Sequence, residues 1–84
     1  MIVQVNSKDT VVVCLRMIDT GQSVEIDGKT IVARQPILAG HKMAIVDHQS
    51  GQQVLKFGWP IGKAACAIAA GEHVHTHNLL CTHE

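Results

Sequence analysis

The segment Asp19-Thr20-Gly21-Gln22-Ser23-Val24 is the first of four similar segments in this chain of 84 residues. Each copy places small or polar residues before a glycine, and then two further residues and a hydrophobe; the other copies are residues 38–43, 49–54 and 69–74. Because glycine adopts positive φ at little cost, each copy predicts a tight turn that leads into a strand. Four such turns predict a fold of many short strands.

The segments between these turns support strands. Val11 to Leu15 and Ile31 to Ala33 are rich in β-branched residues, which are typical of strands. Asp27-Gly28 stands between the short apolar runs Val24 to Ile26 and Thr30 to Val32, and this dipeptide is a strong signal for a hairpin turn. We therefore predict a hairpin with its turn at Asp27-Gly28.

The segment from Ile61 to Ala70 is the main ambiguity. Its alanines favour a helix, but Gly62 and Gly71 bracket it, so we predict a mostly extended chain with a short helical turn at 67–70 as the alternative. The length allows one small domain with a modest core. The sequence therefore predicts a single all-β domain over residues 1–84, in which exposed strand edges leave room for self-association into a homo-oligomer.

Composition excludes several classes of function. Seven basic and seven acidic residues give a net charge of zero, and with one Trp, one Phe and no Tyr the chain offers nucleic acid neither a basic stripe nor a stacking platform. The apolar run Val11 to Leu15 is far short of the roughly 20 residues of a membrane helix. Cys14, Cys66 and Cys81 are odd in number, which argues against a disulfide framework and for a reducing compartment. We predict a cytoplasmic protein that binds neither nucleic acid nor membrane.

Three histidines, His73, His75 and His77, occupy alternate positions near the C-terminus. On an extended chain they would share one face, and an imidazole-lined face suits a divalent metal, an anionic substrate or a proton relay. Two of the three can bend onto one ion, whereas the third would need a bulge or would contact substrate instead. The alternative is a solvated histidine-rich segment.

Other candidate residues are weaker. His41-Lys42 follows a turn glycine and can bind a carboxylate, unless it is merely a solvated turn. Asn78 can orient a hydroxyl or carboxylate, or close the strand by bonding its own backbone. Glu72 is a candidate base or a solvated side chain. The aromatic residues within Lys56 to Pro60 form either a binding lip or, more often in such a context, core packing.

Four motifs, taken in order, resemble the N-terminal SAF-type domain of altronate and galactarate dehydratases, and the small alpha subunit of sulfolactate sulfo-lyase is similar. The motifs are Ile37 to Ala44, Gly51 to Gly58, Pro60 to Gly62 and Ile68 to Leu79. The resemblance runs from Asp9 to Leu79, and the ordered combination of Gly-His-Lys, Lys-Phe-Gly and Gly-Glu-His-Val-His-Thr-His-Asn is specific.

The resemblance implies a β-clip fold of short bent strands and long loops, either fused to a large catalytic domain or made as a separate small subunit. It implies β-elimination from a small acidic sugar-derived substrate with a divalent metal, Fe²⁺ or Mn²⁺. We therefore expect a hydro-lyase part that is inactive alone and shares its site with a large catalytic subunit. The expected roles are metal binding by His73, His75 and His77, catalysis by His75 and His77, and carboxylate binding by His41, Lys42 and Asn78.

Two further functions remain open at this point. Related SAF-type domains are non-catalytic modules that bind a ligand or a partner, and the histidine run argues against this function without excluding it. The other open function is that of a small metal-carrying protein, which would hold metal tightly without a partner. The substrate is selected largely by residues outside this chain.

Overall fold

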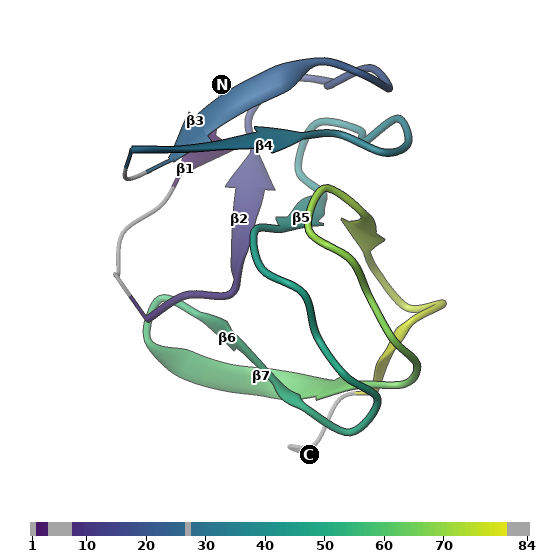
Figure 1. The fold of residues 1–84 in the computed structure, drawn as a ribbon. Helices are drawn as coiled ribbons and strands as arrows, with labels where there is room; N and C mark the ends of the chain where they lie inside the picture. Colours follow the sequence, from purple (N-terminus) through teal and green to yellow (C-terminus); the bar gives the residue numbers. More distant parts are fainter. Residues whose placement is uncertain (1, 4–7, 27, 81–84) are drawn as a thin grey trace.

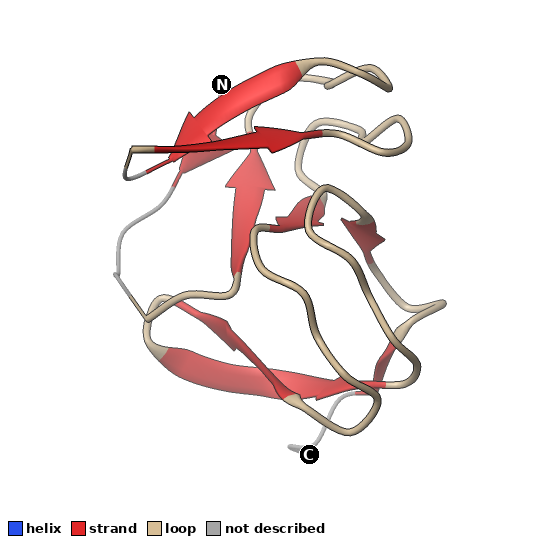
Figure 2. Cartoon of the chain, viewed as in Figure 1, coloured by secondary structure: helices blue, strands red, loops and turns tan. Residues whose placement is uncertain are grey.

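A computed structural model describes residues 2–3, 8–26 and 28–80, and within them the fold is all-β with no helix (Figures 1 and 2). The prediction of an all-β domain is confirmed, and residues 67–70 form part of a loop rather than a helical turn. No helix among these residues is long and apolar enough to cross a membrane. The strands are β1 (Ile2–Val3), β2 (Val11–Cys14), β3 (Ser23–Ile26), β4 (Lys29–Val32), β5 (Lys42–Ala44), β6 (Gln53–Lys56), β7 (Trp59–Ala64), β8 (His73–Val74) and β9 (Leu79–Leu80).

A four-stranded antiparallel sheet in the order β1-β2-β5-β8 forms the centre of the molecule. The pair β3–β4 lies on one side of it and the sheet β6-β7-β9 on the other (Figure 1). Successive side chains of β5 enter different cores: Met43 belongs to the cluster toward β3–β4, and Ala44 to the cluster toward β6–β7. Strand β5 is buried on both faces, and only β8 lies beyond it at that edge of the sheet.

Four loops carry the glycine repeat that the sequence predicts: loop 1 (residues 15–22), loop 2 (34–41), loop 3 (45–52) and loop 4 (65–72). In each loop the glycine has positive φ: +87° at Gly21, +83° at Gly40, +87° at Gly51 and +92° at Gly71. Each loop then enters a strand, namely β3, β5, β6 or β8. The predicted turns are confirmed.

The loops pair in antiparallel fashion, loop 1 with loop 2 and loop 3 with loop 4. Each pair is held by reciprocal backbone hydrogen bonds of 2.7–2.9 Å, between Ile18 and Ile37 in the first pair and between His48 and Ile68 in the second. These four residues occupy the same place in their loops, and each is at most 2% exposed. One residue per loop thus anchors the loop in the core.

The chain is therefore built from two structurally similar halves, residues 14–42 and 44–73. The Gly21 amide donates to the Ala33 carbonyl in the first half, as the Gly51 amide donates to Ala64 in the second, both at 2.8 Å. The Gly40 amide likewise donates to Cys14, at the same 2.7 Å that separates the Gly71 amide from the Ala44 carbonyl. The repeat in sequence is thus a repeat in backbone structure.

Two-residue turns close the hairpins of the two halves. Ile26 pairs with Lys29, so the predicted hairpin is present and Gly28 has φ +79°, while Asp27 lies outside the described residues. In the second hairpin Phe57 (φ +55°) and Gly58 (φ +79°) form the turn, and positive φ at both positions matches the twist of hairpin strands.

The expectation that the aromatic residues near Pro60 pack in the core is wrong. Trp59 is 74% exposed and Phe57 is 45% exposed, because the hairpin register places both at the outer end of β6–β7. Of the three cysteines, Cys14 is buried and free, Cys66 is exposed and free, and Cys81 lies outside the described residues.

Candidate functional site

Three imidazoles meet where β5 begins and β8 ends. The antiparallel register pairs Met43 with His73, and its continuation places His41 opposite His75. Directly opposed residues lie about 5 Å apart at Cβ, and the ring centroids of His41 and His75 are 4.5 Å apart. The His73 ring stacks beside both, at 4.9 Å from His41 and 5.4 Å from His75. We call His41, His73 and His75 the imidazole cluster.

The cluster has the geometry of a metal site. One ring nitrogen from each of its three residues lies within 4.8 Å of the other two, and all three side chains are half-buried. His41 Nδ1 and His73 Nε2 are 2.8 Å apart, so one nitrogen can donate its N–H to the lone pair of the other, and the tautomers of the two rings decide which one donates. A divalent ion binds an imidazole nitrogen at about 2.0–2.1 Å. Small movements of the three side chains would place their ring nitrogens at that distance from a single ion between them.

Electrostatics favour the neutral form of the central ring. Burial lowers the pKa of His73 below its ordinary value, and the positive charge that His41, His77, His75 and Lys42 can carry lowers it further. A neutral imidazole is the form that binds metal or accepts a proton. The cluster thus keeps a ligand available near neutral pH.

His77 lies at the margin of this cluster. The predicted extended run ends early, since β8 stops at Val74 and residues 75–78 form a turn. His77 is exposed, and its ring is tilted 38° against that of His73 at a centroid distance of 5.3 Å. The structure therefore joins His73 and His75 to His41, rather than to His77, within the short nitrogen distances.

Asn78 causes this early turn. It is 6% exposed, its Oδ1 accepts the His75 amide at 2.9 Å, and its Nδ2 donates to the His73 carbonyl at 2.8 Å. Both ends of the amide hold the backbone of the cluster, so the structure gives Asn78 a positioning role. Half-buried Lys42 lies on β5 beside His41. Substrate binding by His41, Lys42 and Asn78 stays a prediction.

Comparison of the four loops explains why His41 is free to join the cluster. In three loops the residue after the glycine closes its own turn, because its side-chain oxygen accepts the amide three residues earlier: Gln22 from Asp19, Gln52 from Gln49, and Glu72 from Ala69, at 2.8–3.2 Å. In loop 2 this place belongs to His41, whose ring faces His73 instead. Glu72 is thus a turn-closing residue rather than a simply solvated one.

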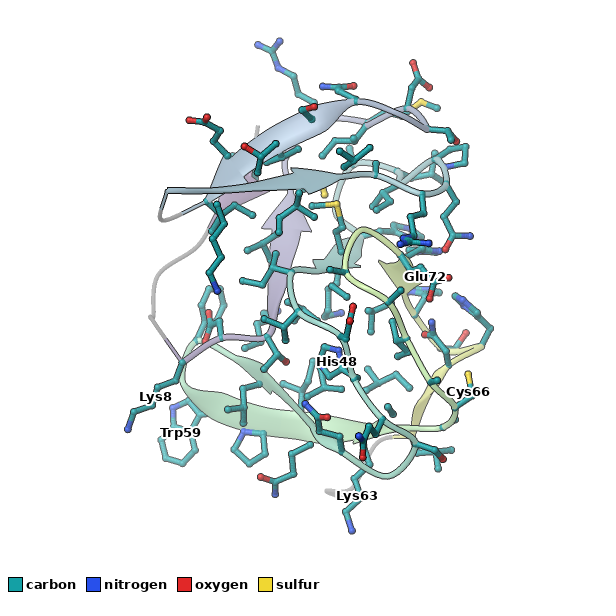
Figure 3. The ribbon with its side chains drawn as sticks, in the orientation of Figure 1. Lys8, His48, Trp59, Lys63, Cys66 and Glu72 are labelled. Atoms are coloured by element: carbon teal, nitrogen blue, oxygen red, sulfur yellow. The ribbon has the colours of Figure 1, made fainter. Side chains whose placement is uncertain are left out.

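A second exception to the repeat is His48, which no sequence pattern singled out. It occupies the anchor position where the other loops have isoleucine, inside the molecule (Figure 3). It is 2% exposed, and neither ring nitrogen has a hydrogen-bond partner. Burial lowers the pKa of His48, although the nearby Val46 carbonyl and Asp47 carboxylate oppose that effect. Aligning the four glycine segments would have revealed the substitution.

Comparison with known proteins gives one consistent result. Residues 1–82 match the model of the altronate/galactarate dehydratase SAF domain. Over 76 residues, 90% of this chain, it is 42% identical to altronate dehydratase of Escherichia coli (strain K12) and 34% identical to that of Bacillus subtilis (strain 168). It is 41% identical over 46 residues, 55% of this chain, to (2R)-sulfolactate sulfo-lyase subunit alpha of Chromohalobacter salexigens.

The aligned regions are a small part of some relatives and a large part of others. They span 15% of either altronate dehydratase but 49% of the sulfo-lyase alpha subunit. The same domain thus forms a segment of a long chain in one case and much of a small subunit in the other. The family match, the identities and the all-β fold agree, and the chain belongs to the altronate/galactarate dehydratase SAF domain family.

Proposed function

We propose that this domain is the accessory part of a sugar-acid hydro-lyase and contributes the imidazole cluster to an active site that a large catalytic subunit or domain completes. The observation that carries the proposal is the convergence of His41, His73 and His75 from two strands, with ring nitrogens within 4.8 Å. The family supports the lyase class. Because three half-buried imidazoles with no acidic partner in the cluster lack the groups for a complete elimination, the domain is expected to be inactive alone.

The imidazole cluster fits a divalent metal. Imidazole nitrogens bind Fe²⁺ well and Mn²⁺ less well, and three protein ligands leave positions for substrate oxygens. His41, His73 and His75 would hold the ion, in place of the set His73, His75 and His77 expected from the sequence. When bound, the ion would supply a Lewis acid for the negative charge that develops next to the substrate carboxylate.

The reaction would remove the proton on the carbon next to the carboxylate and expel the hydroxyl on the following carbon as water, leaving an enol. The base for that proton would belong to the catalytic subunit. His77, which is exposed beside His73, would protonate the departing hydroxyl, and Lys42 would attract the carboxylate. Asn78 would act by holding the backbone of His73 and His75 in place.

The test reconstitutes the chain with the large lyase chain of the same host and measures turnover of altronate, galactarate and sulfolactate, together with bound metal. The double variant His41→Ala/His75→Ala should lower turnover at least about a hundredfold. Gln52→Ala is the matched control, because it changes the same position of loop 3, which contributes no residue to the imidazole cluster. Unchanged turnover with unchanged metal content in the double variant would remove the cluster from the mechanism. If the wild-type chain bound the large lyase chain but the complex turned over none of the three acids, a non-catalytic binding module would be favoured.

A further inference from the structure

Loops 1 and 2 expose large apolar side chains. Met17 is 51% exposed and Leu38 is 53% exposed. The antiparallel pairing of Ile18 with Ile37 places Met17 and Leu38 opposite one another, and since both isoleucines point into the core, their neighbours point outward. The two side chains therefore cover the same outer face of the loop pair.

A third exposed apolar side chain belongs to the same loop pair and lies near the backbone of His41. Leu15 is 56% exposed, and continuation of the β2–β5 register places it opposite Gly40. The next residue along loop 2 is His41, whose carbonyl accepts the Cys14 amide at 2.9 Å. We call Leu15, Met17 and Leu38 the loop 1–loop 2 patch; it borders the candidate active site.

The corresponding positions of the second half do not form such a patch. Leu15 corresponds to Ile45, which is 9% exposed and packs in the core, and Leu38 corresponds to the small Ala69. Met17 corresponds to Asp47, whose Oδ1 accepts the Ala70 amide at 2.9 Å. The loop frame thus forms without exposed hydrophobes at these positions, so the patch is not required by the fold.

We propose that the loop 1–loop 2 patch is the surface on which the catalytic part of the lyase docks. The proposal rests on the proposed function, because the cluster beside the patch needs a second surface to complete it. In altronate dehydratases the matching segment is 15% of the chain, so a catalytic body several times larger accompanies this domain there.

The size of a stable interface agrees with this placement. A specific interface covers about 800 Å² on each partner, which is more than three side chains provide. A partner centred on the loop 1–loop 2 patch would therefore extend over its surroundings, which include His41. An apolar centre with methionine and a polar rim is the usual composition of such interfaces.

A second exposed apolar surface, formed by the aromatic side chains of Phe57 and Trp59, does not fit the same partner. Phe57 and Trp59 lie at the β6–β7 turn, and Figure 3 places Trp59 at the lower left and Glu72, the neighbour of His73, on the right side of the molecule. A body seated on Trp59 would be centred away from the imidazole cluster. This surface therefore provides a matched control.

The test titrates the large lyase chain of the same host with the domain by calorimetry. The variant Leu15→Ser/Met17→Gln/Leu38→Ser should bind at least about tenfold more weakly than wild type, yet reach wild-type turnover when the large chain is saturating. Phe57→Asn/Trp59→Ser should bind within about twofold of wild type; asparagine suits the positive φ at residue 57. Circular dichroism checks that both variants fold.

Several outcomes would overturn the docking surface. These are wild-type affinity in the patch variant, an equal loss in the Phe57/Trp59 variant, or a wild-type homodimer that the patch variant dissociates without change in affinity for the large chain. Patch-dependent binding without turnover of any acid would support the docking surface and contradict the lyase function instead.

Discussion

The two halves of this domain share one backbone frame and differ at a few decisive side chains. Residues 14–42 and 44–73 form equivalent hydrogen bonds around equivalent glycines, and each half pairs two loops through two buried anchors. The first half departs from the repeat at His41, which joins an imidazole cluster, and the second departs at His48, which takes an isoleucine's place in the core. The comparison separates the residues that both halves need for their backbone structure from the residues, such as His41, that only one half carries.

The largest expected effect distinguishes two equivalent glycines, Gly40 and Gly71. Both have positive φ, but a Cβ at Gly71 would approach the Val32 carbonyl oxygen to 2.1 Å, whereas a Cβ at Gly40 would meet nothing within 4 Å. Gly40→Ala should lower the free energy of unfolding by about 1–2 kcal/mol, the cost of the left-handed conformation. Gly71→Ala should cost at least about 3 kcal/mol, because loop 4 must also move away from Val32. Urea denaturation followed by circular dichroism measures both, and equal losses would contradict the close approach.

A smaller effect is expected when His41 of loop 2 is replaced by the glutamine found at the same position of loops 1 and 3. In His41→Gln the amide should close the turn as Gln22 and Gln52 do, so the free energy of unfolding should change by no more than about 0.5 kcal/mol. Affinity for Zn²⁺, used as the probe ion, should fall at least about tenfold because one of three ligands is lost. Calorimetry at pH 7.5 measures the affinity.

The reverse exchange is the control for that variant. Gln52→His places an imidazole at the same position of loop 3, where the described residues offer no other candidate metal group, and it should leave Zn²⁺ affinity unchanged. Wild-type Zn²⁺ affinity in His41→Gln would show that the cluster is not a metal site.

The smallest effect concerns pH and His48. Burial lowers its pKa below 6.5, so the unfolded chain takes up a proton there at a higher pH than the folded chain does. Stability is therefore retained above about pH 6.5 and falls as the pH falls below it, and His73 acts in the same direction. His48→Ile should remove the contribution of His48 and, by relieving two unpartnered ring nitrogens, stabilise the domain by about 1 kcal/mol at pH 7.5.

Thermal and urea unfolding at pH 7.5 and pH 5.5 test this prediction. The loss of stability between the two pH values should be smaller in His48→Ile than in wild type. Equal losses in both proteins would mean that the buried ring does not contribute to the acid sensitivity of the domain.

Sequence patterns predicted the local structure well, since turns depend on single residues. Glycines 21, 40, 51 and 71 all adopt positive φ, and the predicted hairpin forms around Gly28. The extended histidine run was too long by several residues, because the Asn78 side chain binds the backbone at His73 and His75 and turns the chain. That alternative was visible in the sequence, as asparagine often bonds its own backbone.

The composition of the imidazole cluster could not be predicted in the same way. His41 and His73 are 32 residues apart, and they meet only through the register of β5 against β8. A shift of one residue in that register would place His41 and His75 on opposite faces, so the cluster depends on long-range pairing. The exposed Trp59 was misjudged for a related reason, because its exposure follows from a hairpin end that no local pattern marked.

The sequence by itself determined where the chain turns, that it forms strands, and to which family it belongs, because glycine torsions, β-branched side chains and ordered motifs are properties of neighbouring residues. Only the tertiary structure decided that His41 completes the cluster, that Asn78 supports it and that His48 is buried. Those outcomes depend on strand register and on packing between the two loop pairs, which join residues far apart in the chain.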